Sequence, residues 1–184
     1  MGGSKGSGFE REIAKQLGLW WTHGERDDIF WRTSQSGGRA TVRRQKGKST
    51  ANQDGDLCAT DPIGQPLIDK TTIELKVGYN GWTIKELIDS KRKCLTTLEQ
   101  FFSQASREAE SQDKDCWWLI TRQDRRNTLI FMNHKFWKWL KPRVKFPEAV
   151  TVISILHPQF GPVHCMTLEL FLNIVEPELF NEEQ

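Results

Sequence analysis

Two carboxylates and a lysine near the middle of the chain have residue types and spacing that can bind a divalent cation and act on a phosphate. The segment GDLCATDPIGQPLIDKTTIELK, residues 55 to 76, places Asp56 before one strand-like run and puts Glu74 and Lys76 two apart on the next. Carboxylate oxygens are the ligands that Mg²⁺ prefers, so Asp56 and Glu74 on adjacent strands can converge on one ion. An ammonium on the strand face of Glu74 can orient a water or stabilise charge on a scissile phosphate.

A third carboxylate, Glu10, lies on a predicted helix over residues 7–20. Apolar residues recur there at helical spacing, and Ser7 can cap the first turn. Glu10 precedes Ile13 by three positions and Leu17 by seven, so it points toward the buried side of the helix. A carboxylate in that position needs a partner, which a metal-bound water or a basic residue would supply.

Each of these residues also has a plain structural explanation. An exposed Glu–Lys pair on a hairpin is ordinary surface chemistry, and the pattern D-x(17)-E-x-K occurs by chance in many charged proteins. Asp54 competes with Asp56 for the same ligand position, because residues two apart share a strand face. The spacing alone therefore leaves open whether these side chains hold a metal.

The elements that must position these residues alternate between helix and strand. We expect strands at 30–33, 56–60 and 72–77, with the second and third joined through a turn at 61–64. The later elements are a helix over 84–110 with a break near 89–93, a hairpin of 117–121 and 128–132, a short helix at 135–140, a strand at 149–156 and a helix at 167–175. This order predicts an α/β or α+β fold, with a sheet flanked by helices.

The length and charge of the chain limit its organisation and its partners. The 184 residues suffice for one domain with a real core, and two domains are not expected. The net charge of +2 is only mildly basic, but residues 39–48 are rich in Lys and Arg and contain no acid. A local basic run of this kind is what binding a phosphate backbone requires, and a solvated surface loop is the alternative interpretation.

The cysteines and the overall hydropathy indicate an intracellular protein. No C-x-x-C pair occurs, so we expect free thiols in a reducing compartment and no zinc site. We also find no signal-peptide segment and no long apolar run, which predicts a soluble, cytoplasmic protein without membrane contact.

The segment KFWKWLKPRVKF, residues 135–146, interleaves aromatic and basic side chains. Such a run can stack on splayed bases and hold phosphates. We favour the alternative that the aromatic stripe is buried and the Lys stems extend to solvent. A dimer contact is a third interpretation.

Four motifs, taken in order, resemble the PD-(D/E)xK nuclease superfamily, and more narrowly the archaeal-type Holliday-junction resolvases and their phage-encoded relatives. They are GSGFEREIAKQL, FWRTSQSGGR, GDL and IELK. The resemblance covers about residues 4–132, which would be the nuclease core of a single domain, 1–184, with about 133–184 as a C-terminal elaboration. The proline that the family has before the first metal Asp is absent, and Gly55 stands in its place.

The resemblance implies a restriction-endonuclease-like core, with a central mixed β-sheet between helices. It implies an Mg²⁺-dependent endonuclease, with Mn²⁺ able to substitute, that hydrolyses phosphodiester bonds in branched DNA during recombination and leaves a 5′-phosphate and a 3′-hydroxyl. It also implies a homodimer that cuts both strands of a four-way junction, in the host cytoplasm if the protein is phage-encoded.

The resemblance assigns roles by position in the motifs. Asp56, Glu74 and the backbone carbonyl of Leu75 would hold the metal, with Glu10 reaching it directly or through water, and Lys76 would be the catalytic lysine. Ser36 matches a serine in the loop needed for cutting, and Gln104 resembles a glutamine on the helix after the catalytic strands. The basic residues that would support the site or hold DNA are Arg11, Arg32, Arg39, Arg43, Arg44, Lys46 and Lys48.

Two alternatives to a junction resolvase stay open. A nuclease of the same fold can act on plain duplex or single-stranded DNA, as restriction and repair enzymes do. A DNA-binding relative can also keep the fold and lose the chemistry, although the presence of all four of Glu10, Asp56, Glu74 and Lys76 favours an active enzyme.

Overall fold

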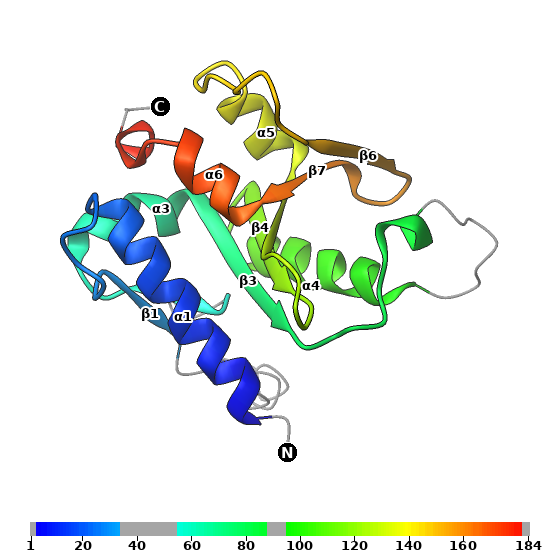
Figure 1. Ribbon diagram of the computed structural model, residues 1–184, viewed down its shortest axis with the longest axis horizontal. Coiled ribbons are helices and arrows are strands. Elements are labelled where there is room, and N and C mark those ends of the chain that lie inside the picture. Colours follow the sequence, from blue (N-terminus) through cyan, green and yellow to red (C-terminus); the bar gives the residue numbers. More distant parts are fainter. Residues whose placement is uncertain (1–2, 34–54, 88–94, 182–184) are drawn as a thin grey trace.

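A five-stranded mixed sheet organises the molecule (Figure 1). The structure is a computed structural model, and it describes residues 3–33, 55–87 and 95–181. Strand β3 runs parallel to β4, and the other neighbours in the order β3-β4-β5-β7-β6 are antiparallel. The strands are β3 (Thr71–Val77), β4 (Cys116–Arg122), β5 (Leu129–Asn133), β6 (Ile153–His157) and β7 (Gly161–Thr167). The predicted sheet flanked by helices is therefore confirmed, as is the hairpin of β4 and β5.

Helices cover both faces of this sheet because its strands carry apolar residues on both sides. In β4, Trp118 belongs to one buried cluster while Trp117 and Leu119 belong to the other. Helix α4 (Thr97–Ser111) packs on the second face, and it is also the crossover that parallel β3 and β4 require. The first face is covered by α1 (Gly3–Trp21), α3 (Gln65–Lys70), α5 (His134–Leu140) and α6 (Leu168–Ile174).

A separate two-stranded sheet lies against α1. Its strands, β1 (Phe30–Arg32) and β2 (Leu57–Ala59), pair with each other, so the predicted direct hairpin between 56–60 and 72–77 is wrong. The segment expected to be a simple turn instead forms the 3₁₀ helix η1 (Pro62–Gly64), which runs directly into α3. The Asp61 side chain accepts a hydrogen bond from the Ile63 amide at 3.1 Å, and a proline starts each helix, where its missing N–H costs nothing.

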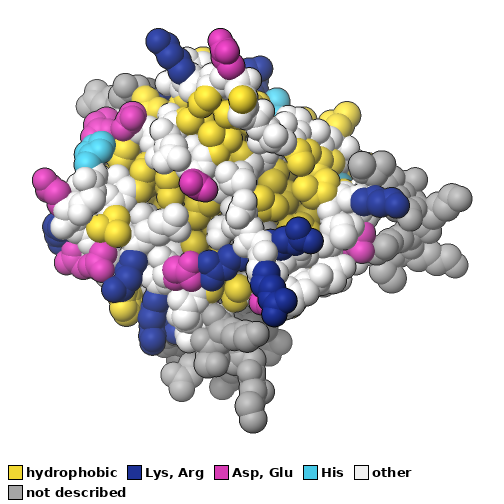
Figure 2. All heavy atoms as spheres, in the orientation of Figure 1, with side chains coloured by type: hydrophobic (Ala, Val, Ile, Leu, Met, Phe, Trp, Pro, Cys, Tyr) yellow, Lys and Arg dark blue, Asp and Glu magenta, His cyan; other side chains and the backbone are white. Residues whose placement is uncertain are grey.

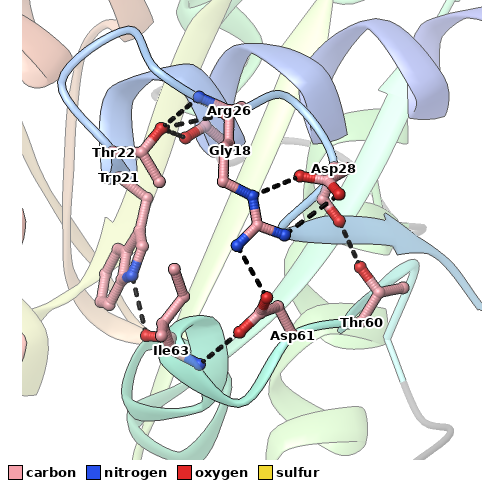
Figure 3. Close-up of polar contacts among 8 residues, drawn as sticks. All are labelled: Gly18, Trp21, Thr22, Arg26, Asp28, Thr60, Asp61 and Ile63. Atoms are coloured by element: carbon pink, nitrogen blue, oxygen red, sulfur yellow. Dashed lines mark hydrogen bonds and ion pairs between the residues drawn. The ribbon is translucent and has the colours of Figure 1, made fainter.

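Polar contacts at the end of α1 fix β1, β2 and η1 to one another (Figure 3). The Arg26 guanidinium donates to Asp28 Oδ1 at 2.9 Å and to Asp61 Oδ2 at 2.8 Å. Trp21 Nε1 donates to the Ile63 carbonyl at 2.8 Å, and Thr60 Oγ1 donates to the Asp28 carbonyl. These bonds connect the end of α1 to the segment before β1 and to the segment after β2, the strand that follows Asp56.

In the N-terminal half of the chain, the helices begin and end at other residues than predicted. Helix α1 begins at Gly3, so Ser7 lies inside it, and the predicted cap is wrong. The helix expected over 84–110 is instead the 3₁₀ helix η2 (Ile84–Leu87) followed by α4, and the break predicted at 89–93 lies outside the described residues. Helix α4 starts at a capping box in which Thr96 and Glu99 exchange hydrogen bonds.

The C-terminal third of the chain contributes two strands, β6 and β7, to the same five-stranded sheet. Strand β7, which the sequence did not predict, inserts between β5 and β6, and the strand expected at 149–156 is Ile153–His157. Rings of Phe136 on α5 and Phe171 on α6 meet Trp118 with centroids 5.1 and 4.9 Å away. The last element in the described part of the chain is the 3₁₀ helix η3 (Pro177–Phe180).

The aromatic and basic run at 135–146 packs as we favoured. Phe136 and Leu140 are fully buried, and Trp137 and Trp139 are partly buried against the core. The lysines of α5 lie outward, where Lys135 pairs with Asp115. Within the described ranges, no helix is long and apolar enough to cross a membrane.

Candidate active site

Backbone hydrogen bonds hold Asp56 between β1 and β3. The Thr33 amide donates to the Asp56 carbonyl at 2.9 Å, and the Asp56 amide donates to the Ile73 carbonyl at 2.9 Å. The preceding residue, Gly55, has φ +86°, and a Cβ there would lie 3.2 Å from Thr72 Cγ2. This left-handed turn favours glycine and aims Asp56 at the edge of β3.

Strand β3 is the edge strand of its sheet, which leaves backbone groups free to meet Asp56. The Leu75 amide donates to Asp56 Oδ2 at 2.8 Å. The N–H and C=O of one strand residue point to the same side, so the Leu75 carbonyl also faces the Asp56 side of β3. Asp56 and this carbonyl, both predicted metal ligands, are therefore brought together.

Glu74 and Lys76 lie on the opposite face of β3 from Ile73 and Leu75, toward α4. Glu74 is 1% exposed, and its Oε1 accepts a hydrogen bond from Lys76 Nζ. No donor among the described residues reaches its other oxygen, Oε2, which is buried. The Glu74 and Lys76 pair is thus a buried interaction, which differs from an exposed surface pair on a hairpin.

Glu10 reaches the same region from α1. Its carboxylate pairs with Arg32 on β1 at 3.3 Å, and both side chains are largely shielded from solvent. The negative charge of Glu10 acts on Asp56, so these two predicted ligands lie close enough to interact. The prediction that Glu10 points inward and finds a basic partner is confirmed.

Burial and like charges shape the proton affinities of the site. Burial, with contributions from Glu10 and Glu108, raises the pKa of Asp56 to about 6, although Lys76 and the Leu75 amide oppose the shift. Burial, and after it the negative charge of Asp56, raises the pKa of Glu74 well above its ordinary value. Burial alone would lower the pKa of Lys76, but Glu74 and Asp56 outweigh it and raise this pKa. Lys76 is therefore an ammonium at neutral pH.

Helix α4 and strand β4 add Glu108 and Thr121, two polar residues near Glu74 and Lys76 that the sequence reasoning missed. Glu108 stands within hydrogen-bonding reach of Glu74, and Gln104 Nε2 donates to Glu108 Oε1 at 3.0 Å. Thr121 on β4, in register with Lys76, is 1% exposed, and its hydroxyl has no partner in the described part of the chain. The helical spacing of Phe101, Gln104 and Glu108 was the available signal, because these positions lie on one face of α4.

Only some of the basic residues predicted to hold DNA lie in the part of the chain that the structure describes. Arg11 is exposed on α1 and Arg32 pairs with Glu10, whereas Asp54, Ser36, Arg39, Arg43, Arg44, Lys46 and Lys48 lie outside the described residues. Arg125 and Arg126, in the turn between β4 and β5, are also exposed. Figure 2 shows Lys and Arg side chains over the lower half of this face, where Figure 1 has the N-terminal half of α1 and this turn.

The carboxylates fit a hard divalent cation in ligand type. The unpartnered, buried Oε2 of Glu74 is an oxygen that a cation can satisfy, and Asp56, Glu10 and the Leu75 carbonyl add further oxygens. One group of three possible ligands has all its ligand atoms within 4.8 Å of one another in the described residues, and it is the exposed set His23, Glu176 and Glu178. The carboxylates of the candidate site therefore do not gather that closely, and two of them are in ion pairs, Glu74 with Lys76 and Glu10 with Arg32.

Comparison with protein families finds a match over nearly the whole chain. The family described as "Phage putative PDDEXK endonuclease" matches residues 2–181, which includes the C-terminal third. Searches of curated proteins and of solved structures found no match.

Proposed function

The chain belongs to the phage PDDEXK endonuclease family, and from this membership and the site we propose that it is a metal-dependent DNA endonuclease that cuts four-way junctions. The observation that carries the catalytic part is the buried Glu74, whose Oε2 has no donor among the described residues while Asp56 and Lys76 lie beside it. A buried carboxylate oxygen without a donor is costly unless a cation binds there. PD-(D/E)xK nucleases generally use divalent metals.

In the proposed mechanism, Asp56, Glu74 and the Leu75 carbonyl hold the ion, with Glu10 as an outer carboxylate. Mg²⁺ suits this oxygen set, and Mn²⁺ would substitute for it. The bound ion would supply Lewis acidity and lower the pKa of a nearby water.

Lys76 acts through its charge in this proposal. Because its pKa is raised, the ammonium cannot serve as a general base at neutral pH. It can donate hydrogen bonds to the attacking water or to a phosphate oxygen on which negative charge develops. Attack of water on phosphorus with loss of the 3′-oxygen, which takes a proton, would leave a 5′-phosphate and a 3′-hydroxyl.

The choice of branched DNA rests on the order of the four motifs, which is that of the Holliday-junction resolvases. A homodimer would supply two such sites to opposite strands, and the host cytoplasm would be its location. On the described surface, the exposed Arg11, Arg125 and Arg126 could contact phosphates flanking the cut.

Cleavage of matched substrates tests this function. The native protein, Glu74→Gln and the control Asp69→Asn, whose carboxylate is exposed on α3, would be incubated with four-way junction, splayed-arm, duplex and single-stranded DNA, in Mg²⁺, Mn²⁺ or EDTA. We expect paired symmetric nicks in the junction with either metal, no cutting in EDTA or by Glu74→Gln, and full activity of Asp69→Asn.

The other outcomes separate the parts of the proposal. Equal cutting of linear DNA would retain the metal chemistry and refute junction specificity. Binding of DNA without metal-dependent cutting of any substrate would refute the nuclease and favour a binding protein.

A further inference from the structure

Glu108 is a partly buried carboxylate beside the candidate active site, and the sequence motifs assign no role to it. It lies on α4, the helix that covers the β3 face carrying Glu74 and Lys76. Its Oε1 accepts a hydrogen bond from Gln104, while its Oε2 is buried with no donor among the described residues. Glu108 and Glu74 approach within hydrogen-bonding reach, and each has an unpartnered buried oxygen.

The charges around this pair are unbalanced. Lys76 interacts with Glu74, Asp56 and Glu108, so one ammonium faces three carboxylates. Arg32 is paired with Glu10, and the Gln104 amide that holds Glu108 is neutral. Neighbouring buried carboxylates repel one another unless a proton or a cation lies between them.

We propose that Glu108 is a further carboxylate ligand of the divalent cation, reaching it from α4, and that Gln104 is the positioning residue that orients it. This inference rests on the proposed function, because it concerns the same ion. Ligands would then come from β3, from the segment before β2 and from α4. The cation would connect the two sides of the active site, and it would be bound directly by Glu108 or through one of its waters.

The geometry supports a positioning role for Gln104. Residues 104 and 108 are one turn apart on α4, and their 3.0 Å bond restricts the rotamer of Glu108. The amide donates through Nε2 and leaves Oε2 of Glu108 free for an ion. An amide can hold a carboxylate in this way without supplying a charge that would compete with the cation.

Metal binding measured apart from catalysis tests the proposal. Mn²⁺ affinity would be determined by titration calorimetry, with melting temperatures in EDTA and in Mn²⁺, for the native protein, Glu108→Gln and Glu110→Gln. Glu110 is the matched control, because it is exposed two residues away on the same helix. We expect Glu108→Gln to weaken Mn²⁺ binding by about 10-fold or more, to melt higher than the native protein in EDTA, and to gain less from Mn²⁺. Glu110→Gln should match the native protein.

The outcomes distinguish a failure of this inference from a failure of the proposed function on which it rests. If the native protein binds Mn²⁺ and Glu108→Gln binds it equally well, Glu108 is not a ligand, and this inference is refuted while the proposed function stands. If the native protein neither binds Mn²⁺ nor cuts DNA, the proposed function itself fails.

A second variant covers the case in which Glu108→Gln does not fold. Gln104→Leu keeps the carboxylate and removes the bond that orients it, so it should weaken Mn²⁺ binding by a smaller factor, about 3-fold to 10-fold. Unchanged affinity in Gln104→Leu would refute the positioning role.

Discussion

Removing the charge of Asp56 should abolish cutting and yet stabilise the metal-free protein. The pKa of Asp56 is about 6 in the fold, against 3.8 for an unperturbed Asp, so ionisation opposes folding. A difference of about two pKa units corresponds to about 3 kcal/mol of unfolding free energy at pH 7.5. Asparagine retains an oxygen that can accept from the Leu75 amide, so Asp56→Asn loses the charge and keeps this hydrogen bond. We therefore expect its melting temperature in EDTA to exceed that of the native protein by about 5–10 °C.

The pH dependence gives the same prediction a second test. Because the folded pKa is raised, the stabilising effect of the protonated form is fully present below about pH 4 and is lost as the pH rises through about 6. The melting temperature of the metal-free native protein should fall between pH 5 and pH 7.5 for this reason. Asp56→Asn should fall less, because its residual slope comes from Glu74, whose pKa is also raised.

Calorimetry or circular dichroism in EDTA measures these temperatures, and Asp69→Asn is the control for a generic loss of negative charge. Added Mn²⁺ at 1,000 times the dissociation constant should reverse the order, because it stabilises the native protein by about 4.1 kcal/mol and Asp56→Asn by far less. A native melting temperature that is flat between pH 5 and pH 7.5, or a metal-free Asp56→Asn that melts no higher than the native protein, would refute the reasoning.

Three further changes test the parts of the fold that support the site. Gly55→Ala should cost about 2 kcal/mol in urea unfolding, because φ is +86° and the new Cβ would lie 3.2 Å from Thr72 Cγ2; Gly24→Ala, at φ +94° with nothing within 4 Å, should cost less. Lys76→Met should reduce cleavage by about 10²-fold or more while DNA binding persists in a filter assay. Trp118→Ala should lower the unfolding free energy by about 3–5 kcal/mol, since this ring is fully buried among Phe136 and Phe171, and a loss below 1 kcal/mol would contradict that packing.

The sequence predicts those helices and strands in which apolar residues recur at a regular spacing within the segment itself. Ile13 and Leu17 mark the buried face of α1, and the alternation around Glu74 and Lys76 correctly separates the two faces of β3. Strand β7 was missed because it is buried on both faces, so its apolar residues do not alternate, and because Pro162 at its start reads as a turn. The helical segment between β2 and β3 was missed for a related reason, since two prolines there start helices where they also indicate a turn.

The candidate site residues that belong to the sequence motifs could be named from the sequence, and those outside the motifs could not. Asp56, Glu74 and Glu10 were singled out from spacing together with the resemblance to the nuclease motifs, and the structure brings the first two together at the edge of β3. Glu108 could not be identified in the same way. A glutamate at a flank of an amphipathic helix usually faces solvent, and only the crossover packing of α4 on β3 turns it toward Glu74.

The position of β3 at the edge of the sheet links the fold to the proposed chemistry. In a central strand, the backbone groups of Ile73 and Leu75 would bond to a second neighbour and could not meet Asp56. An uncovered edge strand would be prone to pair with other chains, but α1 and the segment around Asp56 shield this one. The same strand carries Glu74 and Lys76 on its α4 face, where burial lowers the local dielectric constant and strengthens the electrostatic interaction between them. The edge position thus leaves the Leu75 carbonyl on the Asp56 side of β3, and the same strand carries Glu74 on a shielded face, so that oxygens of the kind a hard cation binds lie near one another.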